Sequence, residues 1–154
     1  MRDILFRGKS NFEYGNTKKG DWLYGMTIAR HCYNDEEITS YYIGSGNKTI
    51  DGKTLGQYTG LTDKNGTKIF EGDYWLDTDD DYLVYVVEFR DGQFGFVCYG
   101  IQGVLMPYGF DEDAGDFGEI DFSPFTDWNM DSIEINGNIH DNPEVLNREM
   151  GCGE

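Results

Sequence analysis

Short runs of aromatic and β-branched residues, separated every few positions by a glycine-containing turn, most constrain what this chain can fold into. The clearest case is Lys68-Ile69-Phe70, which follows the turn Asp63-Lys64-Asn65-Gly66. Asn-Gly is a strong hairpin signal because both residues tolerate a positive φ. The chain holds 21 glycines, 10 Phe, 11 Tyr and 3 Trp but only 3 prolines. Aromatic side chains suit pleated, half-buried surfaces, so we expect an all-β fold of short strands.

The expected strands fall into two groups. The first group, at 4–7, 22–28 and 41–43, predicts an N-terminal β lobe over residues 1–53, which opens with a hairpin on a long connection. The second group predicts a small β-barrel domain over residues 54–154, with strands at 55–61, 68–70, 74–76, 82–89, 94–99 and 133–139. For residues 100–127 the sequence predicts an acidic insertion loop or an excursion at the edge of the sheet. At the C-terminal end, Asn142 as N-cap and Pro143 at the first helical position predict a one-turn helix.

Charge is divided very unequally along the chain, whose net charge is −17. Residues 1–70 carry ten basic and eight acidic groups, a net charge of +2, whereas residues 71–154 carry 21 acidic and two basic groups, a net charge of −19. An acidic surface repels phosphate backbones and gains nothing from counterion release. The sequence therefore predicts no direct nucleic-acid binding through the second half, and favours a basic protein partner.

The cysteines and the hydropathy pattern bear on the compartment. Cys32, Cys98 and Cys152 are odd in number and widely spaced, which is typical of free thiols in a reducing compartment. No signal segment opens the chain and no apolar run reaches the length of a membrane span. We expect a soluble, cytoplasmic protein that does not enter a membrane.

Two acidic clusters invite a calcium hypothesis, because hard cations prefer several carboxylate oxygens. They are Asp77/Asp79/Asp80/Asp81 and Asp111/Glu112/Asp113/Asp116. Neither follows the EF-hand template, since the fifth position counted from Asp111 is Gly115 and the sixth is Asp116. A solvated acidic loop is the preferred interpretation, and weak cation binding stays open.

The sequence predicts no enzyme. It contains no nucleophile elbow, P-loop or dinucleotide fingerprint, and its histidines lack the paired spacing of a zinc site. A Cys–His nucleophile built from Cys98 and His140 is conceivable only because such pairs need not be neighbours in sequence. We expect no catalytic residue, no cofactor and no metal site.

Three stretches resemble the YopX family. Gln57-Tyr58-Thr59-Gly60-Leu61 through Asp63, Gly66 and Ile69-Phe70-Glu71-Gly72-Asp73 is similar to the pattern Q-Y-T-G-L-x-D-x-x-G-x-x-I-[FY]-x-G-D. Ile135-Asn136-Gly137-Asn138-Ile139-His140-Asp141-Asn142-Pro143-Glu144-Val145-Leu146 resembles the family's closing element, and Arg2–Lys9 with Trp22–Gly25 resembles its opening. The resemblance implies a barrel-like C-terminal part similar to SH3-type barrels, occurrence in phages and prophages, and self-association. It implies no established activity.

Two interpretations of the central stretch stay open. It is either a binding surface or a set of turns, and turn chemistry explains nearly every residue in it. The candidate interaction residues are Gln57, Tyr58, Asp63, Glu71, Asp73, Asp79, Asp80, Asp81, Asp111, Glu112 and Asp113.

Two functional hypotheses follow. In the first, the chain is a non-enzymatic phage or prophage accessory protein whose acidic face engages a basic protein, with a nucleic-acid mimic or host-factor inhibitor as its extreme form. In the second, it is a self-assembling structural protein in which open N-terminal strand edges pair with another copy, giving a homo-oligomer.

Overall fold

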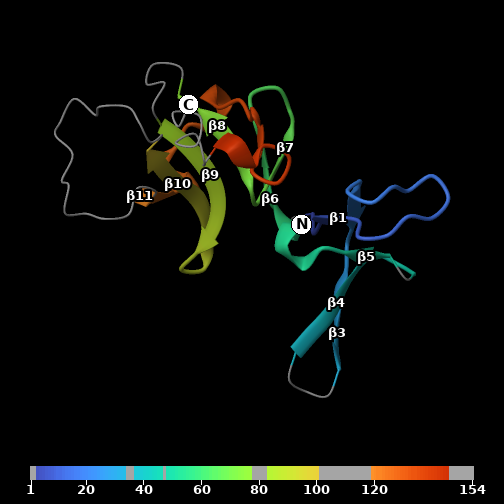
Figure 1. Cartoon of the computed structure of the whole chain (residues 1–154). Helices are drawn as coiled ribbons and strands as arrows, with labels where there is room; N and C mark the ends of the chain where they lie inside the picture. Colours follow the sequence, from blue (N-terminus) through green and yellow to red (C-terminus); the bar gives the residue numbers. More distant parts are fainter. Residues whose placement is uncertain (1–2, 34–36, 47, 78–82, 101–118, 146–154) are drawn as a thin grey trace, which may run out of the picture. The chain divides into compact units, whose positions relative to one another are not determined.

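Antiparallel β-strands and short 3-10 turns make up the regular structure of this protein. The computed structural model describes residues 3–33, 37–46, 48–77, 83–100 and 119–145 (Figure 1). The all-β prediction is confirmed, and the described residues contain no α-helix. The chain divides into two compact units, Met1–Gly60 and Leu61–Glu154.

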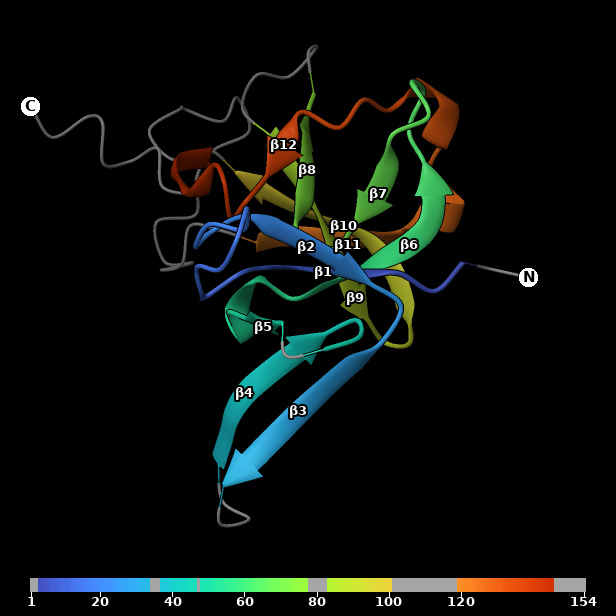
Figure 2. The same ribbon diagram turned by 90° about the vertical axis from the view of Figure 1, so that its right-hand side faces the viewer.

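The first unit is built from strands β1 to β5, the 3-10 turn η1 and the start of β6. Their bounds are β1 Phe6–Lys9, β2 Trp22–Gly25, β3 Ile28–Tyr33, β4 Glu37–Ile43, β5 Thr49–Ile50, η1 Gly52–Thr54 and β6 Gly56–Thr62. β1 pairs with β2 along its full length, which confirms the expected opening hairpin. β3 and β4 form a second, longer hairpin, and β5 pairs with the other edge of β4 (Figure 2). Ile43, Ile50 and Tyr58 are the buried apolar residues in the described part of this unit.

The boundary between the units lies after Gly60, whereas the sequence placed it after Lys53. The reason is the start of β6, where Gly56 and Gln57 pair with Arg7 and Phe6 of β1. Backbone pairing across about fifty residues therefore assigns this stretch to the first unit.

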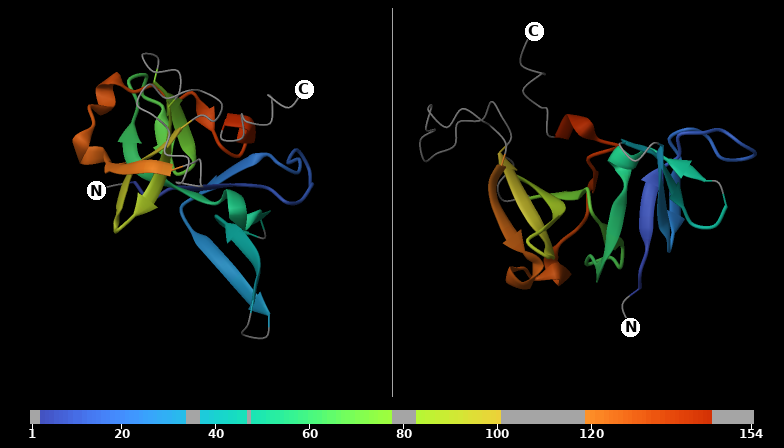
Figure 3. Two further views of the ribbon diagram at one scale, coloured as in Figure 1. Left: turned by 60° about the vertical axis from the view of Figure 1, so that its left-hand side comes forward. Right: turned by 90° about the horizontal axis from the view of Figure 1, so that it is seen from below.

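The second unit centres on a five-stranded antiparallel sheet with the order β11-β10-β9-β8-β12. Its elements are β7 Lys68–Phe70, β8 Asp73–Leu76, β9 Leu83–Arg90, β10 Gln93–Gly100, β11 Glu119–Pro124, η3 Phe125–Asp127, η4 Met130–Ser132, β12 Gly137–Asn138 and η5 Pro143–Val145. Strands β9, β10 and β11, yellow-green to orange in Figure 3, run side by side. The described sheets are open, and closure into an SH3-like barrel stays a prediction.

Both faces of this sheet are covered by apolar side chains. Successive residues of a strand point to opposite faces. Along β9, Val87 belongs to a buried cluster with Ile69, Phe96, Phe125 and Ile133, whereas Val84 and Val86 pack with Tyr74 and Val145. The two clusters explain why β9 is apolar at nearly every position rather than at alternate ones.

Several elements differ from the expected strands. In the first unit, the strand expected at 22–28 ends at Gly25, the strand expected at 41–43 is the end of the longer β4, and β3 and β5 were not expected. β11 lies inside the region expected to be an insertion, and it pairs with β10 from Pro124 to Glu119. The expected strand at 133–139 is reduced to Gly137–Asn138, because Ile133 O and Ile135 N bond to Lys64 and Asp63 of a turn instead of to a strand. The expected C-terminal turn is confirmed as η5, which Val145 N closes on Asn142 O at 3.1 Å.

Phe96 gives a test of the sheet core. The Phe96→Ala variant should lose about 3–5 kcal/mol of unfolding free energy, because the ring is 1% exposed and the cavity left behind is closed on all sides. Phe89→Ala is the matched control, since Phe89 is 53% exposed in the neighbouring strand, and it should lose under about 1 kcal/mol. Urea denaturation followed by tryptophan fluorescence measures both, and equal losses would contradict the packing described.

Candidate interaction sites

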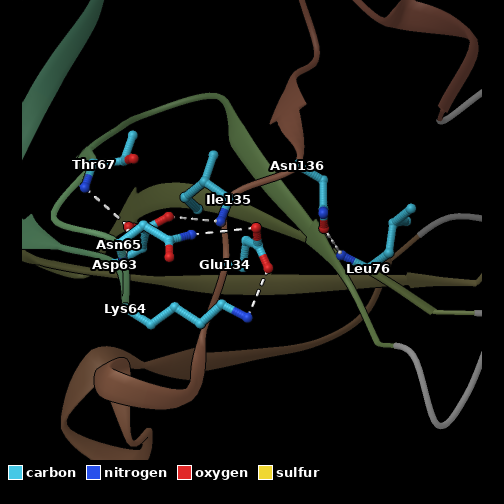
Figure 4. Close-up of polar contacts among 8 residues, drawn as sticks. All are labelled: Asp63, Lys64, Asn65, Thr67, Leu76, Glu134, Ile135 and Asn136. Atoms are coloured by element: carbon cyan, nitrogen blue, oxygen red, sulfur yellow. Dashed lines mark hydrogen bonds and ion pairs between the residues drawn. The ribbon is translucent and has the colours of Figure 1, made fainter.

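The turn after β6 is organised around one carboxylate. Asp63 Oδ1 accepts hydrogen bonds from the backbone N–H groups of Asn65 and Thr67, both at 2.9 Å. Asp63 Oδ2 accepts a third bond, at 3.0 Å, from the backbone N–H of Ile135 (Figure 4). The first two bonds close the Asn-Gly turn on itself, and the third ties it to a segment about seventy residues later in the chain.

The same two segments meet through three further contacts. The backbone N–H of Lys64 donates to Ile133 O at 2.9 Å. The Lys64 ammonium forms an ion pair with Glu134 Oε2 at 2.7 Å, and the Asn65 amide donates to Glu134 Oε1 at 3.2 Å (Figure 4). The hydrogen bond and charge of Lys64 lower the pKa of Glu134. This pair is exposed, so the backbone bonds and Asp63 hold the two segments more firmly than the ion pair does.

Opposing effects act on the pKa of Asp63. Burial raises it, but hydrogen bonds from the backbones of Ile135, Thr67 and Asn65, with a further one from the Thr67 side chain, outweigh burial. The net result is a pKa below the ordinary value of 3.8. Asp63 is therefore a charged, internally satisfied group at neutral pH.

A second set of hydrogen bonds connects the β7–β8 turn to the C-terminal segment. Asp73 Oδ2 accepts a bond from Phe70 N at 2.8 Å, which closes the turn between the two strands. Gly72 N donates to Val87 O and Gly72 O accepts from Ile139 N, both at 2.9 Å. Gly72 has a φ of +86°, and a Cβ there would meet the His140 ring. The positive φ therefore favours glycine, and a Cβ would also require the His140 ring to shift slightly.

The closing element stabilises its own turn. Asn138 Oδ1 accepts bonds from the backbones of His140 and Asp141, and Asn138 Nδ2 donates to Asp141 Oδ2 at 2.8 Å. Just before it, Asn136 Oδ1 accepts a bond from Leu76 N at 2.8 Å (Figure 4). The Asn136 side chain therefore bonds to a strand residue, whereas the Asn138 side chain closes its own turn.

The structure places the candidate interaction residues in different settings. Tyr58, Asp63 and Asp73 are buried, and Gln57 and Glu71 are half-buried. Asp63 and Asp73 direct their carboxylates to backbone groups of their own unit, as the turn interpretation of this stretch expects. Asp79, Asp80, Asp81, Asp111, Glu112 and Asp113 lie outside the described residues, and their role stays a prediction.

Comparison with known protein families gives a match over most of the chain. The family model described as YopX protein matches residues 5–147. The chain belongs to the YopX family. No curated protein matches it. Among solved structures, the YopX chain is similar to protein EF1440 from Enterococcus faecalis, at 19% sequence identity and a TM-score of 0.46, over 93% of this chain and 97% of that one.

The described part of this YopX protein brings few reactive groups together. Within it, no group of three or more His, Cys, Asp or Glu side chains could hold a metal ion. Cys32 is an exposed free thiol on β3, and Cys98 is half-buried on β10. His140 lies beside Gly72. No helix among the described residues is long and apolar enough to cross a membrane.

One feature of the first unit escaped the sequence analysis. A groove of about 730 Å³ is lined by residues that include Lys9, Lys19 and Lys53. Its lining residues come from four stretches that are separated in the sequence, so no local sequence motif indicates the groove. Its only signal in the sequence is the balance of charge in residues 1–70, which is slightly positive in an otherwise acidic protein.

Replacing Asp63 tests the hydrogen bonds that connect the two motif segments. Asn offers one oxygen where the carboxylate offers two, so Asp63→Asn leaves a backbone N–H facing an amide group and should cost about 2–3 kcal/mol at pH 7. The control is Asp127→Asn, which makes the same charge change at an exposed position and should be nearly neutral.

The stability difference between wild type and Asp63→Asn should also depend on pH. Because the folded pKa of Asp63 is lowered, its contribution is full above the unfolded value near 3.8 and is lost as the pH falls through the folded pKa. Denaturation between pH 7 and pH 2 should therefore show the difference between wild type and Asp63→Asn shrinking only at the acid end. A difference that stays constant at all pH values would argue against a charged Asp63.

Proposed function

We propose that this chain is a non-enzymatic accessory protein, encoded by a phage or prophage and acting in the bacterial cytoplasm. In this proposal its second unit binds a basic protein through an acidic surface. The supporting observation is the charge of that unit. Residues 61–154 hold 22 acidic and 4 basic groups, a net charge of −18, whereas residues 1–60 hold seven acidic and eight basic groups, a net charge of +1.

The ion pairs of the second unit support the proposal. Among its described basic residues, Lys64 pairs with Glu134 and Arg90 pairs with Glu88 at 2.9 Å. These cations are neutralised by carboxylates of their own unit. The remaining acidic excess therefore acts on the surroundings as a field of one sign.

The internal contacts of the motif residues point the same way. Asp63, Gly72, Asp73 and Asn138 bond to backbone groups of the second unit, which is what a fold-maintaining role requires. We infer that the family motif maintains the fold, and that partner binding depends on acids outside the motif. Those acids are then particular to this member.

A basic protein surface is the partner that this charge suits. Complementary charge accelerates encounter and selects against acidic partners, and both effects weaken as salt screens the field. A host protein surface that normally binds nucleic acid has the required sign, so mimicry of nucleic acid is the extreme form of the proposal.

Neutralising the acidic clusters tests this function. The test variant combines Asp79→Asn, Asp80→Asn, Asp81→Asn, Asp111→Asn, Glu112→Gln and Asp113→Asn. A partner captured from host lysate at low salt and then purified should bind this variant at least about tenfold more weakly than wild type. Wild-type affinity should also fall steeply as salt rises from about 0.05 to 0.5 M.

A control variant tests whether loss of acidic charge elsewhere in the chain has the same effect. Asp3→Asn with Glu13→Gln removes exposed acidic charge from the first unit and should leave the affinity within about twofold. If the six-residue variant binds as tightly as wild type, the acidic surface is not the binding surface.

A second candidate function, self-assembly, is favoured by the edge of the first sheet. β2 is the last strand of its sheet among those described, and it pairs with β1 on one side only. On and just after β2, Tyr24 is 56% exposed and Met26 is 71% exposed. An edge strand with exposed apolar side chains is a template for pairing with another chain.

Edge pairing predicts a change in mass. Wild type should be an oligomer by light scattering, and Tyr24→Lys with Met26→Lys should reduce it to the monomer mass, because lysines on an edge block strand pairing. Tyr14→Lys, at a position that is 84% exposed outside the strands, should leave the oligomer intact. A wild-type monomer, or an oligomer that survives the double change, would exclude assembly through this edge.

A further inference from the structure

The groove in the first unit lies where four segments of that unit meet. Its walls come from the end of β1, the connection that follows β1, strand β4, and the stretch from β5 into η1. Lys9, Lys19 and Lys53 line it together with Ser40, Tyr41 and Asp51. Its volume, about 730 Å³, is within the usual range for sites that hold a small molecule.

Backbone hydrogen bonds hold these walls in place. Ser10 N donates to Asp21 O and Gly20 N donates to Ser10 O, both at 2.8 Å, which fixes the connection against the end of β1. Asp51 N donates to Lys9 O and Lys9 N donates to the Thr54 hydroxyl, again at 2.8 Å, which fixes η1 against the same strand. The groove is therefore formed before any ligand arrives, which lowers the cost of binding.

Charge in the groove is positive, unlike the charge of the protein as a whole. Within the described part of the chain, three lysines line it against one carboxylate, that of Asp51. The carboxylate of Asp51 accepts a hydrogen bond from Lys53 N at 3.0 Å, and this bond stabilises the turn that contains Asp51. Lys19 and Lys53 are exposed, and the Lys9 ammonium lies 5.4 Å from the centre of the Trp22 ring. The field in the groove thus favours an anion.

The types of donor distinguish between anions. Planar carboxylates are best matched by the fork of an arginine, and no arginine of the described residues lines the groove. Lysine acts as a point charge and is a common binder of tetrahedral phosphate. The hydroxyl-bearing side chains of Ser40 and Tyr41 add neutral donors of the kind that complete a phosphate site.

We infer that this groove binds a small phosphorylated molecule that carries at least two negative charges, with Lys19 and Lys53 as its principal ligands. This site is independent of the proposed acidic interaction surface, because it lies wholly in the first unit. It gives this protein a ligand-binding function besides protein interaction.

Inorganic pyrophosphate is the probe, added to the full-length protein at about 0.1 M salt, where surface electrostatics are moderately screened. Calorimetry should give a dissociation constant below about 1 mM. In amide NMR spectra, the signals of Gly20 and Gly52, which line the groove, should shift during the titration. Lys19→Ala with Lys53→Ala should weaken binding by about tenfold or more.

A matched control separates the groove from general charge. Lys18→Ala with Lys48→Ala removes the same charge from two exposed lysines of the first unit that do not line the groove, and binding should stay within about twofold. Well-dispersed NMR spectra of both variants establish that they are folded. Absence of binding at about 10 mM pyrophosphate, an equal loss in the control, or equally tight binding of citrate would overturn the inference.

Discussion

The carboxylate of Asp63 is the interaction on which the second unit depends most. It closes the turn after β6 through Asn65 and Thr67, and it also holds Ile135, far away in the sequence. A buried carboxylate needs several donors to offset its loss of hydration, and here backbone N–H groups supply them. Because those donors come from two segments, satisfying one side chain also brings the segments together.

The motif residues share this role. Asp73 closes the β7–β8 turn, Gly72 joins that turn to β9 and to Ile139, and Asn138 closes the turn before η5. Residues that bond inward in this way cannot also present those atoms to a partner. In this chain those atoms serve the fold, so a proposal about function has to rest on other features: the acidic excess, the β2 edge and the lysine-lined groove.

The sequence predicted much of the local structure and missed elements whose formation depends on a neighbour. Asn65-Gly66 marked its hairpin correctly, and β7 was predicted with its observed bounds because turn chemistry is local. β11 was missed because Glu119 and Asp121 make its sequence resemble a polar loop, and only pairing with β10 makes it a strand. The strand expected at 133–139 was too long, since alternation alone does not show that Ile135 N bonds to Asp63 instead of to a neighbouring strand.

By itself the sequence determined the all-β class, the positions of the main turns and the concentration of acid in the second half. These are properties of neighbouring residues or of simple counts, so they need no knowledge of the fold. The tertiary structure alone decided that Asp63 faces Ile135, that β9 is covered on both faces, and that Lys19 and Lys53 line one groove. Each of these depends on contacts between residues distant in the chain, and such contacts are set by packing and backbone pairing across the whole unit.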